Sequence, residues 1–369
     1  MAWHKRLETW AKLALTLLAS VLFWRPGRRL PLGTPLPLPR KVLLVRPDNR
    51  VGEALLTTPL LRTLKGLVHP PPEVHVLVHA KVVRVLQGHP DADAVLGFDR
   101  RLLWLGPLAP GIRALRRAGY DTVVDCANWS APSVTSALVA RMVGPRAVVV
   151  GPGIWPVRLL QSVSVPARPD TRHEAVQRTH LLTPLTRGIV AQGLSFREPV
   201  LGASFRTYLE GFSGERQRRA VINPGGRLGE RRIPAEAFSA AARELISLGH
   251  VPVVTWGPGE EALAQAVLSG APGAELAPAT SIDELAALMR ASGLTVCNNT
   301  GPMHLSVAVG APTLAFFLRM DMERWGHAVA PHRMVDLTPV VDGGSGAGLE
   351  QRVAEEVRSF VAERGSLTG

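Results

Sequence analysis

From residue 41 onward, short apolar runs alternate with longer amphipathic stretches. The runs 41–46 and 73–79 are rich in Val and Leu without polar alternation, a pattern typical of strands buried on both faces of a parallel sheet. Further strands are predicted at 94–98, 121–126, 147–151, 218–226, 251–257, 294–298 and 312–317. Helices are predicted at 51–65, 107–118, 133–143, 234–248, 260–268, 281–293, from 302, and at 349–364. The chain is therefore predicted to be an α/β protein.

The strand and helix pattern occurs twice. It stops at a polar interval rich in Arg, His and Glu, 168–180, and restarts near 218, so 369 residues are divided into two domains. We expect two doubly wound, Rossmann-like domains that face each other across a cleft. The predicted boundaries are a segment 1–40, a first domain 41–168, a linker 169–218, a second domain 219–340, and a C-terminal helix, 341–369, that packs back across the hinge.

The positive charge is concentrated at the N-terminus. The net charge is +12, and residues 1–40 contribute half of it, with seven basic residues against one acidic residue. The remainder is only mildly basic, so no nucleic-acid partner is expected. Cys126 and Cys297 both end apolar strand-like runs, and buried free thiols are expected rather than a disulfide or a zinc site.

The N-terminal segment combines this charge with an apolar stretch from Leu13 to Trp24. The stretch is shorter than the roughly 20 apolar residues of a spanning helix, and no small-residue cleavage site follows it. We favour a helix in the interface of an anionic membrane over a spanning helix, with a helix packed on the protein body as the third alternative. One helical stripe would hold the residues Trp3, Leu7, Trp10, Ala14, Leu17, Val21 and Trp24. A proline-rich spacer, 30–40, follows.

Three turns of the second half should meet beyond the carboxyl ends of its strands, where open parallel sheets bind ligands. They span 223–234, 256–261 and 298–304. Gly225 and Gly226 would let backbone N–H groups approach a phosphate, and Arg227, Arg231 and Arg232 would add charge. The loop has neither a Walker nor a Gly-x-Gly-x-x-Gly spacing.

The stretch Asn-Asn-Thr-Gly-Pro-Met-His, 298–304, begins a helix. Thr300 and Gly301 stand where unpaired N–H groups and the positive end of the helix dipole would stabilise a pyrophosphate. His304 could donate to the same anion, or it could cap or pack against its own helix.

This stretch, continued to Phe317, resembles the Asp-Ser-Gly-Pro-Met-His signature of family 9 glycosyltransferases, the lipopolysaccharide heptosyltransferases. Four other segments resemble that family in the same order, from about 41 to 320: "KVLLVRPDNRVGEALLTTPLLRTLK", "RHEAVQRTHLL", "INPGGRLGERRIPAEAF" and "SIDELAALMRASGLTVCNN". The resemblance implies a GT-B fold and an inverting transfer, without metal or cofactor, of a sugar such as heptose. The donor would be an ADP-sugar and the acceptor a lipopolysaccharide inner-core glycolipid, on the cytoplasmic face of the inner membrane of a Gram-negative-type bacterium.

The resemblance also suggests roles for individual residues. The base that takes the proton of the acceptor hydroxyl falls on Glu53, where the family has Asp. Asp48 is a nearby fallback and, with Arg50, an acceptor-side candidate. The alternative for Glu53 is an ordinary acid in the first turn of a helix.

On the donor side, the phosphate-binding Lys of the family falls on Arg231 and the acid that contacts the ribose on Glu260 or Glu261. The signature Asp is Asn299. Two other hypotheses are a non-catalytic nucleotide-sugar or glycolipid-binding protein that keeps the GT-B shell, and a nucleotide-sugar epimerase with two Rossmann-like domains.

Overall fold

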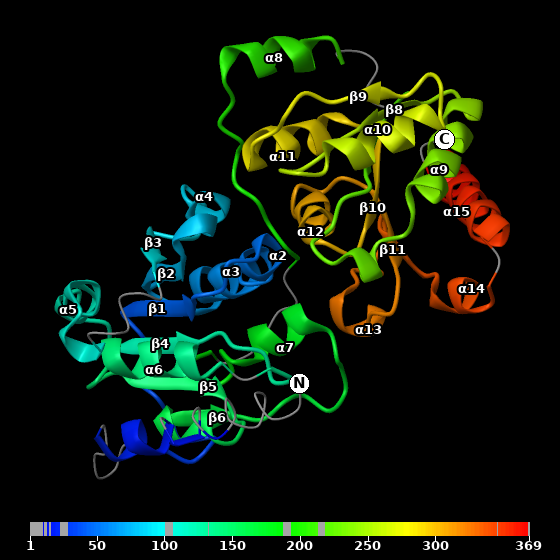
Figure 1. Ribbon diagram of the computed structural model, residues 1–369. Helices are drawn as coiled ribbons and strands as arrows, with labels where there is room; N and C mark the ends of the chain where they lie inside the picture. Colours follow the sequence, from blue (N-terminus) through cyan, green and yellow to red (C-terminus); the bar gives the residue numbers. More distant parts are fainter. Residues whose placement is uncertain are drawn as a thin grey trace. The chain divides into compact units, whose positions relative to one another are not determined.

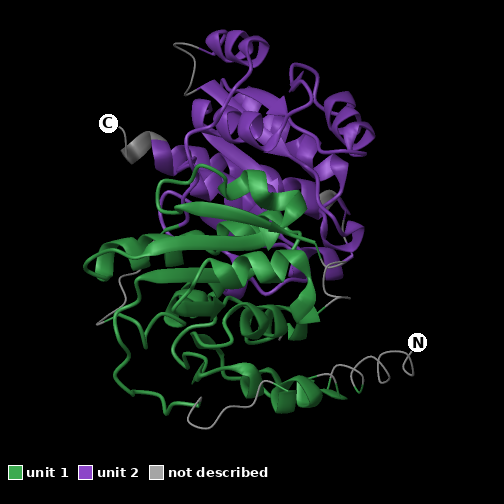
Figure 2. Cartoon of the chain, turned by 90° about the vertical axis from the view of Figure 1, so that its left-hand side faces the viewer, with its two compact units in different colours: residues 1–193 green, residues 194–369 purple. Residues whose placement is uncertain are grey.

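The computed structural model describes residues 29–99, 106–131, 133–186, 193–212, 218–344 and 346–367, together with residues 10, 13–14 and 16–22. The chain divides into two compact units, Met1–Gly193 and Leu194–Gly369, which are coloured separately in Figure 2. This division falls within the predicted linker 169–218. Cys126 and Cys297 are free and buried, as expected.

Unit 1 is built on a six-stranded parallel sheet (Figure 1) in the order β3-β2-β1-β4-β5-β6. Its strands are β1 (Lys41–Arg46), β2 (Glu73–His79), β3 (Ala94–Phe98), β4 (Thr122–Asp125), β5 (Val148–Pro152) and β6 (Val163–Val165). The central strands are buried along almost their whole length, because helices cover both faces of the sheet. The sequence pattern predicts the first five strands and misses the three-residue edge strand β6.

The helices of unit 1 connect these strands. They are α2 (Val51–Leu55), α3 (Thr58–Leu67), α4 (Val83–Leu86), α5 (Pro110–Arg117), α6 (Val134–Val143) and α7 (Glu174–His180). The predicted helix 51–65 is in fact two helices, because Pro59 has no N–H to continue the ladder. Side chains bind the carbonyl groups that this break leaves open: Thr57 Oγ1 donates to Glu53 O at 3.0 Å and Thr58 Oγ1 to Leu55 O at 2.7 Å.

The described part of the N-terminal segment is helical over 16–22 and packs against unit 1 with one side only. Ala19 is 5% exposed and belongs to the core of unit 1, and Thr16 is fully buried. The spacer is also held by this unit, because Leu30 N donates to Ser162 O at 2.8 Å. Among the described residues, no helix combines the length and the hydropathy that crossing a bilayer requires.

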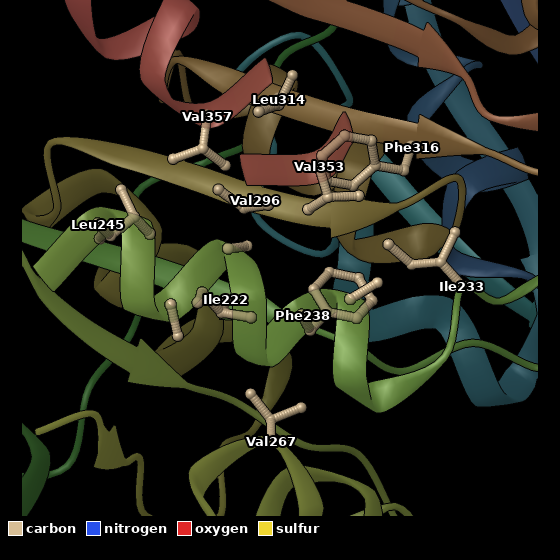
Figure 3. Close-up of a cluster of buried hydrophobic side chains, with 14 of the residues drawn as sticks. Ile222, Ile233, Phe238, Leu245, Val267, Val296, Leu314, Phe316, Val353 and Val357 are labelled. Atoms are coloured by element: carbon tan, nitrogen blue, oxygen red, sulfur yellow. The ribbon is translucent and has the colours of Figure 1, made fainter. Parts of the chain in front are cut away.

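Unit 2 repeats the same architecture in the order β12-β11-β10-β7-β8-β9, again all parallel. Its strands are β7 (Arg219–Asn223), β8 (Val251–Val254), β9 (Glu275–Leu276), β10 (Leu294–Asn298), β11 (Thr313–Phe317) and β12 (Arg333–Asp336). Figure 3 shows the core beside this sheet, where Ile222, Val296 and Phe316 pack against Phe238.

The helices of unit 2 are α8 (Ala203–Glu210), α9 (Ala235–Ser247), α10 (Glu261–Ser269), α11 (Ile282–Ala291), α12 (Gly301–Ala308), α13 (Met322–Trp325), α14 (Thr338–Asp342) and α15 (Gly346–Leu367). Helix α11 begins at the capping box formed by Ser281 and Glu284, as its spacing predicts. Helix α15 packs along α9, and its residues Val353 and Val357 complete the core of unit 2. The crossing of the hinge expected for this helix remains a prediction.

In each sheet there is one pair of neighbouring strands from which the order of the strands along the chain continues outward in both directions. This reversal point identifies the region where each unit can bind a ligand. In unit 1 the reversal lies between β1 and β4, and in unit 2 between β7 and β10. Connections leave these strand pairs toward opposite sides of the sheet, so a crevice forms beyond their carboxyl ends. The turns after β1, β7 and β10 hold most of the sequence-predicted site residues, and Glu260 and Glu261 follow β8.

Candidate functional site

Glu53 of unit 1 lies in the first turn of α2 and is enclosed by cations. Glu53 is 3% exposed. Its Oε2 atom lies 2.8 Å from Arg46 Nη2 and 2.5 Å from Arg178 Nη2. Its Oε1 atom lies 3.2 Å from Arg50 Nη2 and accepts a hydrogen bond from Asn128 Nδ2 at 3.3 Å. We refer to Arg46, Arg50, Glu53, Asn128 and Arg178 as the arginine cage.

The cage is assembled from elements that meet at the reversal point. Arg46 ends β1, Asn128 follows β4, and Arg178 lies in α7. The fully buried Arg178 also donates to Glu53 O at 2.8 Å and to Asn128 Oδ1 at 2.7 Å. It thereby fixes the start of α2 and the loop after β4 at once.

The cage controls the protonation of Glu53. Burial by itself raises the pKa of a carboxyl group, but the charges of Arg46, Arg178 and Arg50 outweigh burial and hold the pKa of Glu53 well below its usual range. A carboxylate with so low a pKa is a weak proton acceptor. Glu53 is thus more than a first-turn helix acid, and its contacts are those of an ionic centre of the fold.

Asp48 occupies the loop between β1 and α2 and is more accessible. Its side chain is 19% exposed, and Arg50 binds it with Nε to Oδ1 at 2.8 Å and Nη2 to Oδ2 at 2.7 Å. The Arg50 side chain is itself 48% exposed. The two acceptor-side candidates therefore form one solvent-facing pair, through which Arg50 links Asp48 to the cage.

In unit 2 the glycine turn after β7 is tied to the turn after β8 by Glu260. Its Oε1 atom accepts from Gly226 N at 2.8 Å and its Oε2 atom from Gly257 N at 3.1 Å. A Cβ atom on Gly225 would stand 2.2 Å from Oε2, so any other residue there would displace the Glu260 carboxylate. The Glu260 carboxylate is therefore occupied by the loop, whereas Glu261 is exposed in the first turn of α10.

The turn after β10 is joined to the same glycine turn. Asn298, fully buried, donates from Nδ2 to Pro224 O at 2.8 Å and accepts from Ile233 N at 3.1 Å. Asn299 donates its backbone N–H to Phe316 O at 3.0 Å, and its side chain is partly exposed. The three turns predicted to meet in unit 2 do lie together.

Gly226 faces the start of α12. A Cβ atom there would lie 2.9 Å from Thr300 Cγ2 and 3.0 Å from Arg232 Cγ. The stem of Arg232 therefore lies over the glycine turn, whereas Arg231, also predicted from the sequence to add charge, is exposed at the end of a short 3-10 turn. Thr300 is the N-cap of α12, whose first N–H groups have no partner within the helix.

His304 lies in the first turn of α12 and is paired with a second histidine. Its Nδ1 atom lies 2.9 Å from Nε2 of His327, and the two rings stand edge to face at 87°. Both residues are buried. One of the two facing nitrogens must donate and the other accept, so at most one ring is cationic while the bond persists.

A cavity of about 690 Å³ in unit 1 lies at the opposite edge of the sheet. It is lined by residues that precede β4 and β5, among them Arg116, Tyr120, Asp121 and Arg146. Because it lies at the amino ends of the strands, it does not belong to the groups at the carboxyl ends. Within the described ranges, no three His, Cys, Asp or Glu side chains come together as metal ligands would.

Sequence reasoning missed several residues that the structure brings into these groups. Arg46, Asn128 and Arg178 complete the cage, and His327 pairs with His304. Asn128 follows a predicted strand, which could have indicated its place at the carboxyl edge. Nothing in the sequence alone indicates the partner of Arg178, since Glu53 lies 125 positions away.

Comparisons with known proteins agree on one family. Residues 111–338 match the model of glycosyltransferase family 9 (heptosyltransferase). The chain is 25% identical over 292 residues to lipopolysaccharide heptosyltransferase 3 of Escherichia coli, covering 74% of this chain and 82% of that protein. It is 26% identical over 296 residues to the protein of the same description from strain K12, covering 74% of this chain and 81% of that protein.

Solved structures agree on the fold. The glycosyl transferase family 9 structure from Veillonella parvula DSM 2008 superposes with a TM-score of 0.72 at 20% identity, covering 89% of this chain and 99% of that one. The Escherichia coli heptosyltransferase WaaC with ADP gives a TM-score of 0.66 at 21% identity, covering 88% and 99%. The fold is GT-B, with two Rossmann-like units.

Proposed function

The chain belongs to glycosyltransferase family 9, the heptosyltransferases, and we propose that it transfers a sugar, heptose in the first instance, from an ADP-sugar to an inner-core lipopolysaccharide glycolipid. It is a glycosyltransferase by family. The proposed reaction inverts the anomeric configuration and needs no metal ion. The relatives' names support the choice: two are lipopolysaccharide heptosyltransferases, and one structure was solved with ADP.

The observation that carries the proposal is the arrangement in unit 2 around Gly226. The glycine turn is fixed by Glu260, which accepts the N–H of Gly226, and it faces Thr300 at the start of α12. The first N–H groups of α12 and the positive end of its dipole are suited to a diphosphate. As negative charge grows on the departing ADP, the same groups would stabilise it more strongly than they stabilise the bound donor.

Side chains around this turn would complete the donor site. Gly301 and the pair His304–His327 lie within α12 and the loop that packs on it, and could donate to a phosphate oxygen. Arg231 is exposed nearby and would add positive charge. Since the Glu260 carboxylate is occupied, the exposed Glu261 and the partly exposed Asn299 are left for sugar hydroxyls.

We further propose that the protein is peripheral on the cytoplasmic face of the inner membrane, with an anionic lipid surface as a partner. The apolar stripe is exposed at the positions that the structure describes: Leu17 is 41% and Val21 71% exposed in the helix at 16–22, and Trp10, which precedes it, is 68% exposed. The predicted stripe residues Trp3, Leu7 and Trp24 lie outside the described residues. An exposed apolar stripe beside basic residues is typical of interfacial helices, and a glycolipid acceptor resides in such a surface.

The test of the function is transfer from ADP-heptose to purified heptose-free inner-core glycolipid. Mass spectrometry should detect one added heptose with release of ADP, and NMR should find the product linkage opposite in configuration to the donor. Gly226→Val should weaken ADP binding at least tenfold by calorimetry, because Thr300 and Arg232 leave no room for a branched side chain. Gly202→Val is the matched control, since a Cβ atom there meets open space. Binding without transfer would contradict the proposal.

A further inference from the structure

Trp155 of unit 1 is a large apolar side chain that the core does not use. It is 53% exposed, and it follows the carboxyl end of β5, in the loop that leads to the short 3-10 turn Val157–Leu160. Val157 and Leu160 are fully buried, so the turn is anchored in the core while Trp155 stays at the surface. Within the described ranges the indole Nε1 of Trp155 has no hydrogen-bond partner. The side chain therefore offers an apolar ring and an N–H donor to a ligand.

A cation lies over this ring. The Arg158 guanidinium stands 5.6 Å from the centroid of the Trp155 ring, a cation–π distance, and covers one face of the ring only. Arg158 is exposed, and its side chain makes no hydrogen bond or ion pair with the part of the chain that the structure describes. An aromatic face orients a guanidinium without using its N–H groups, so these donors remain open to an anion. We refer to Trp155 and Arg158 as the Trp–Arg platform.

Backbone contacts hold the platform at the carboxyl edge of the sheet. Gly153 N donates to Val165 O at 2.7 Å, and Trp129 Nε1 donates to the same oxygen at 3.0 Å. These two bonds join the loops after β4 and β5 to the end of β6 (Figure 1). A Cβ atom on Gly153 would lie only 3.1 Å from Val165 O, so the two segments are closely packed. The platform is thus preorganised, which lowers the entropic cost of binding a ligand.

The platform lies on the same edge of the sheet as the arginine cage. Asn128 of the cage directly precedes Trp129, and β1, β4 and β5 are neighbouring strands. With about 4.8 Å between neighbouring strands, the loops after β1 and β5 begin about 10 Å apart. A short oligosaccharide can bridge this separation. One acceptor molecule could therefore contact the platform while another of its sugars lies beside the cage.

We propose that the Trp–Arg platform binds a second sugar of the acceptor, one that carries a carboxylate or a phosphate group, next to the sugar whose hydroxyl reacts. The inference rests on the proposed sugar transfer and adds a specificity-determining subsite to it. The Trp155 ring packs against the apolar C–H face of the sugar, and Trp155 Nε1 and the Arg158 guanidinium donate to its anionic group. The place beside the cage favours a sugar over a membrane lipid, because the acceptor must reach this edge to react.

The test measures transfer to the water-soluble glycolipid made by removing the acyl chains from heptose-free inner-core acceptor, so that membrane binding cannot contribute. Trp155→Ala should raise the KM for this acceptor about tenfold, with the donor KM changed less than about twofold. Trp155→Phe keeps an apolar ring and should raise the acceptor KM less than about threefold. The melting temperatures of both variants should stay within about 4 °C of wild type, because the side chain is exposed.

Arg158→Gln separates the role of charge from that of packing. It should raise the acceptor KM about three- to tenfold, because a donor to a charged group is lost. Arg117→Gln is the matched control, since Arg117 is exposed at the end of α5, at the amino edge of the sheet, and should leave the acceptor KM unchanged. Two modified acceptors identify the anion, one with its carboxylates methyl-esterified and one with its phosphates removed. The effect of Arg158→Gln should disappear on the acceptor that lacks the group bound by the platform.

Each outcome decides a different statement. An unchanged acceptor KM for Trp155→Ala overturns the platform, and a rise seen only with intact glycolipid in vesicles overturns it in favour of a membrane contact. An effect of Arg158→Gln that persists on both modified acceptors overturns the anionic sugar. In these cases the transfer activity of the wild type stands. Absence of transfer by the wild type overturns the proposed function, and calorimetry of the deacylated glycolipid with wild type and Trp155→Ala then decides the platform by itself.

Discussion

Asp125, at the end of β4, offers a test of the structure that does not depend on any substrate. The residue is fully buried, and its Oδ1 atom accepts hydrogen bonds from Ser136 Oγ and from Ala127 N. Within the described part of the chain its Oδ2 atom has no partner. Burial therefore raises the pKa of Asp125 to about 6, although hydrogen bonds from Ser136 and Ala127 and the charge of Arg46 oppose the rise.

The raised pKa makes stability fall as pH rises. Below the ordinary pKa of 3.8 the carboxyl group is protonated in both the folded and the unfolded chain, so it does not lower the free energy of unfolding. Between about 3.8 and 6 the unfolded chain releases this proton and the folded chain keeps it, so the free energy of unfolding decreases. A difference of about two pH units corresponds to about 3 kcal/mol, all of it lost above pH 6.

Asp125→Asn should remove this dependence. Relative to wild type, the variant should gain up to about 3 kcal/mol in the free energy of unfolding between pH 3.5 and pH 8. Urea denaturation at several pH values gives the free energies, and hydrogen exchange of β4 and β5 assigns the transition to unit 1. Asp91→Asn, a surface carboxylate with a 28% exposed side chain, is the control. Parallel curves for Asp125→Asn and wild type from pH 4 to pH 8 would refute the reasoning.

Two further predictions concern other regions. His327→Ala should weaken ADP binding about three- to tenfold by calorimetry, because the His304 ring loses the partner at 2.9 Å that orients it. The substitution His327→Gln should weaken ADP binding less. Equal ADP affinity of wild type and both variants would count against a role for the pair. Leu17→Glu combined with Val21→Glu should abolish co-sedimentation with anionic vesicles but leave folding intact, because both side chains are exposed. The control Val329→Glu, at a position 74% exposed, should bind vesicles as wild type does. Unchanged vesicle binding by the double variant would exclude this stripe as the contact.

The sequence predicts the central elements of both units because their strands are buried on two faces. Runs such as 41–46 and 294–298 have no polar alternation, and the structure places strands at those bounds. Strands β6, β9 and β12 lie at or next to sheet edges and are two to four residues long, too short for a pattern to define. The break between α2 and α3 could have been expected from Pro59, whose missing N–H ends a helical ladder.

The candidate site was harder to predict, because the contacts of its charged groups are made over long sequence distances. The order of turns along the chain correctly predicts that 223–234, 256–261 and 298–304 meet. The order of turns does not show that Glu260 is bound by the backbone N–H of Gly226, 34 positions away. Nor does it show that Arg178 binds Glu53, 125 positions away. Sequence spacing thus places a carboxylate near a site but does not reveal whether its oxygens are already occupied.

Neighbouring acids in both units differ in burial and in the groups that bind them. In unit 1 Glu53 is buried among Arg46, Arg50 and Arg178, whereas Asp48 is partly exposed and is bound by Arg50. In unit 2 Glu260 accepts two backbone N–H groups, while Glu261 is exposed. The place of an acid in a motif therefore does not decide its chemical role, because that role depends on which groups already bind the carboxylate and on whether a substrate can reach it.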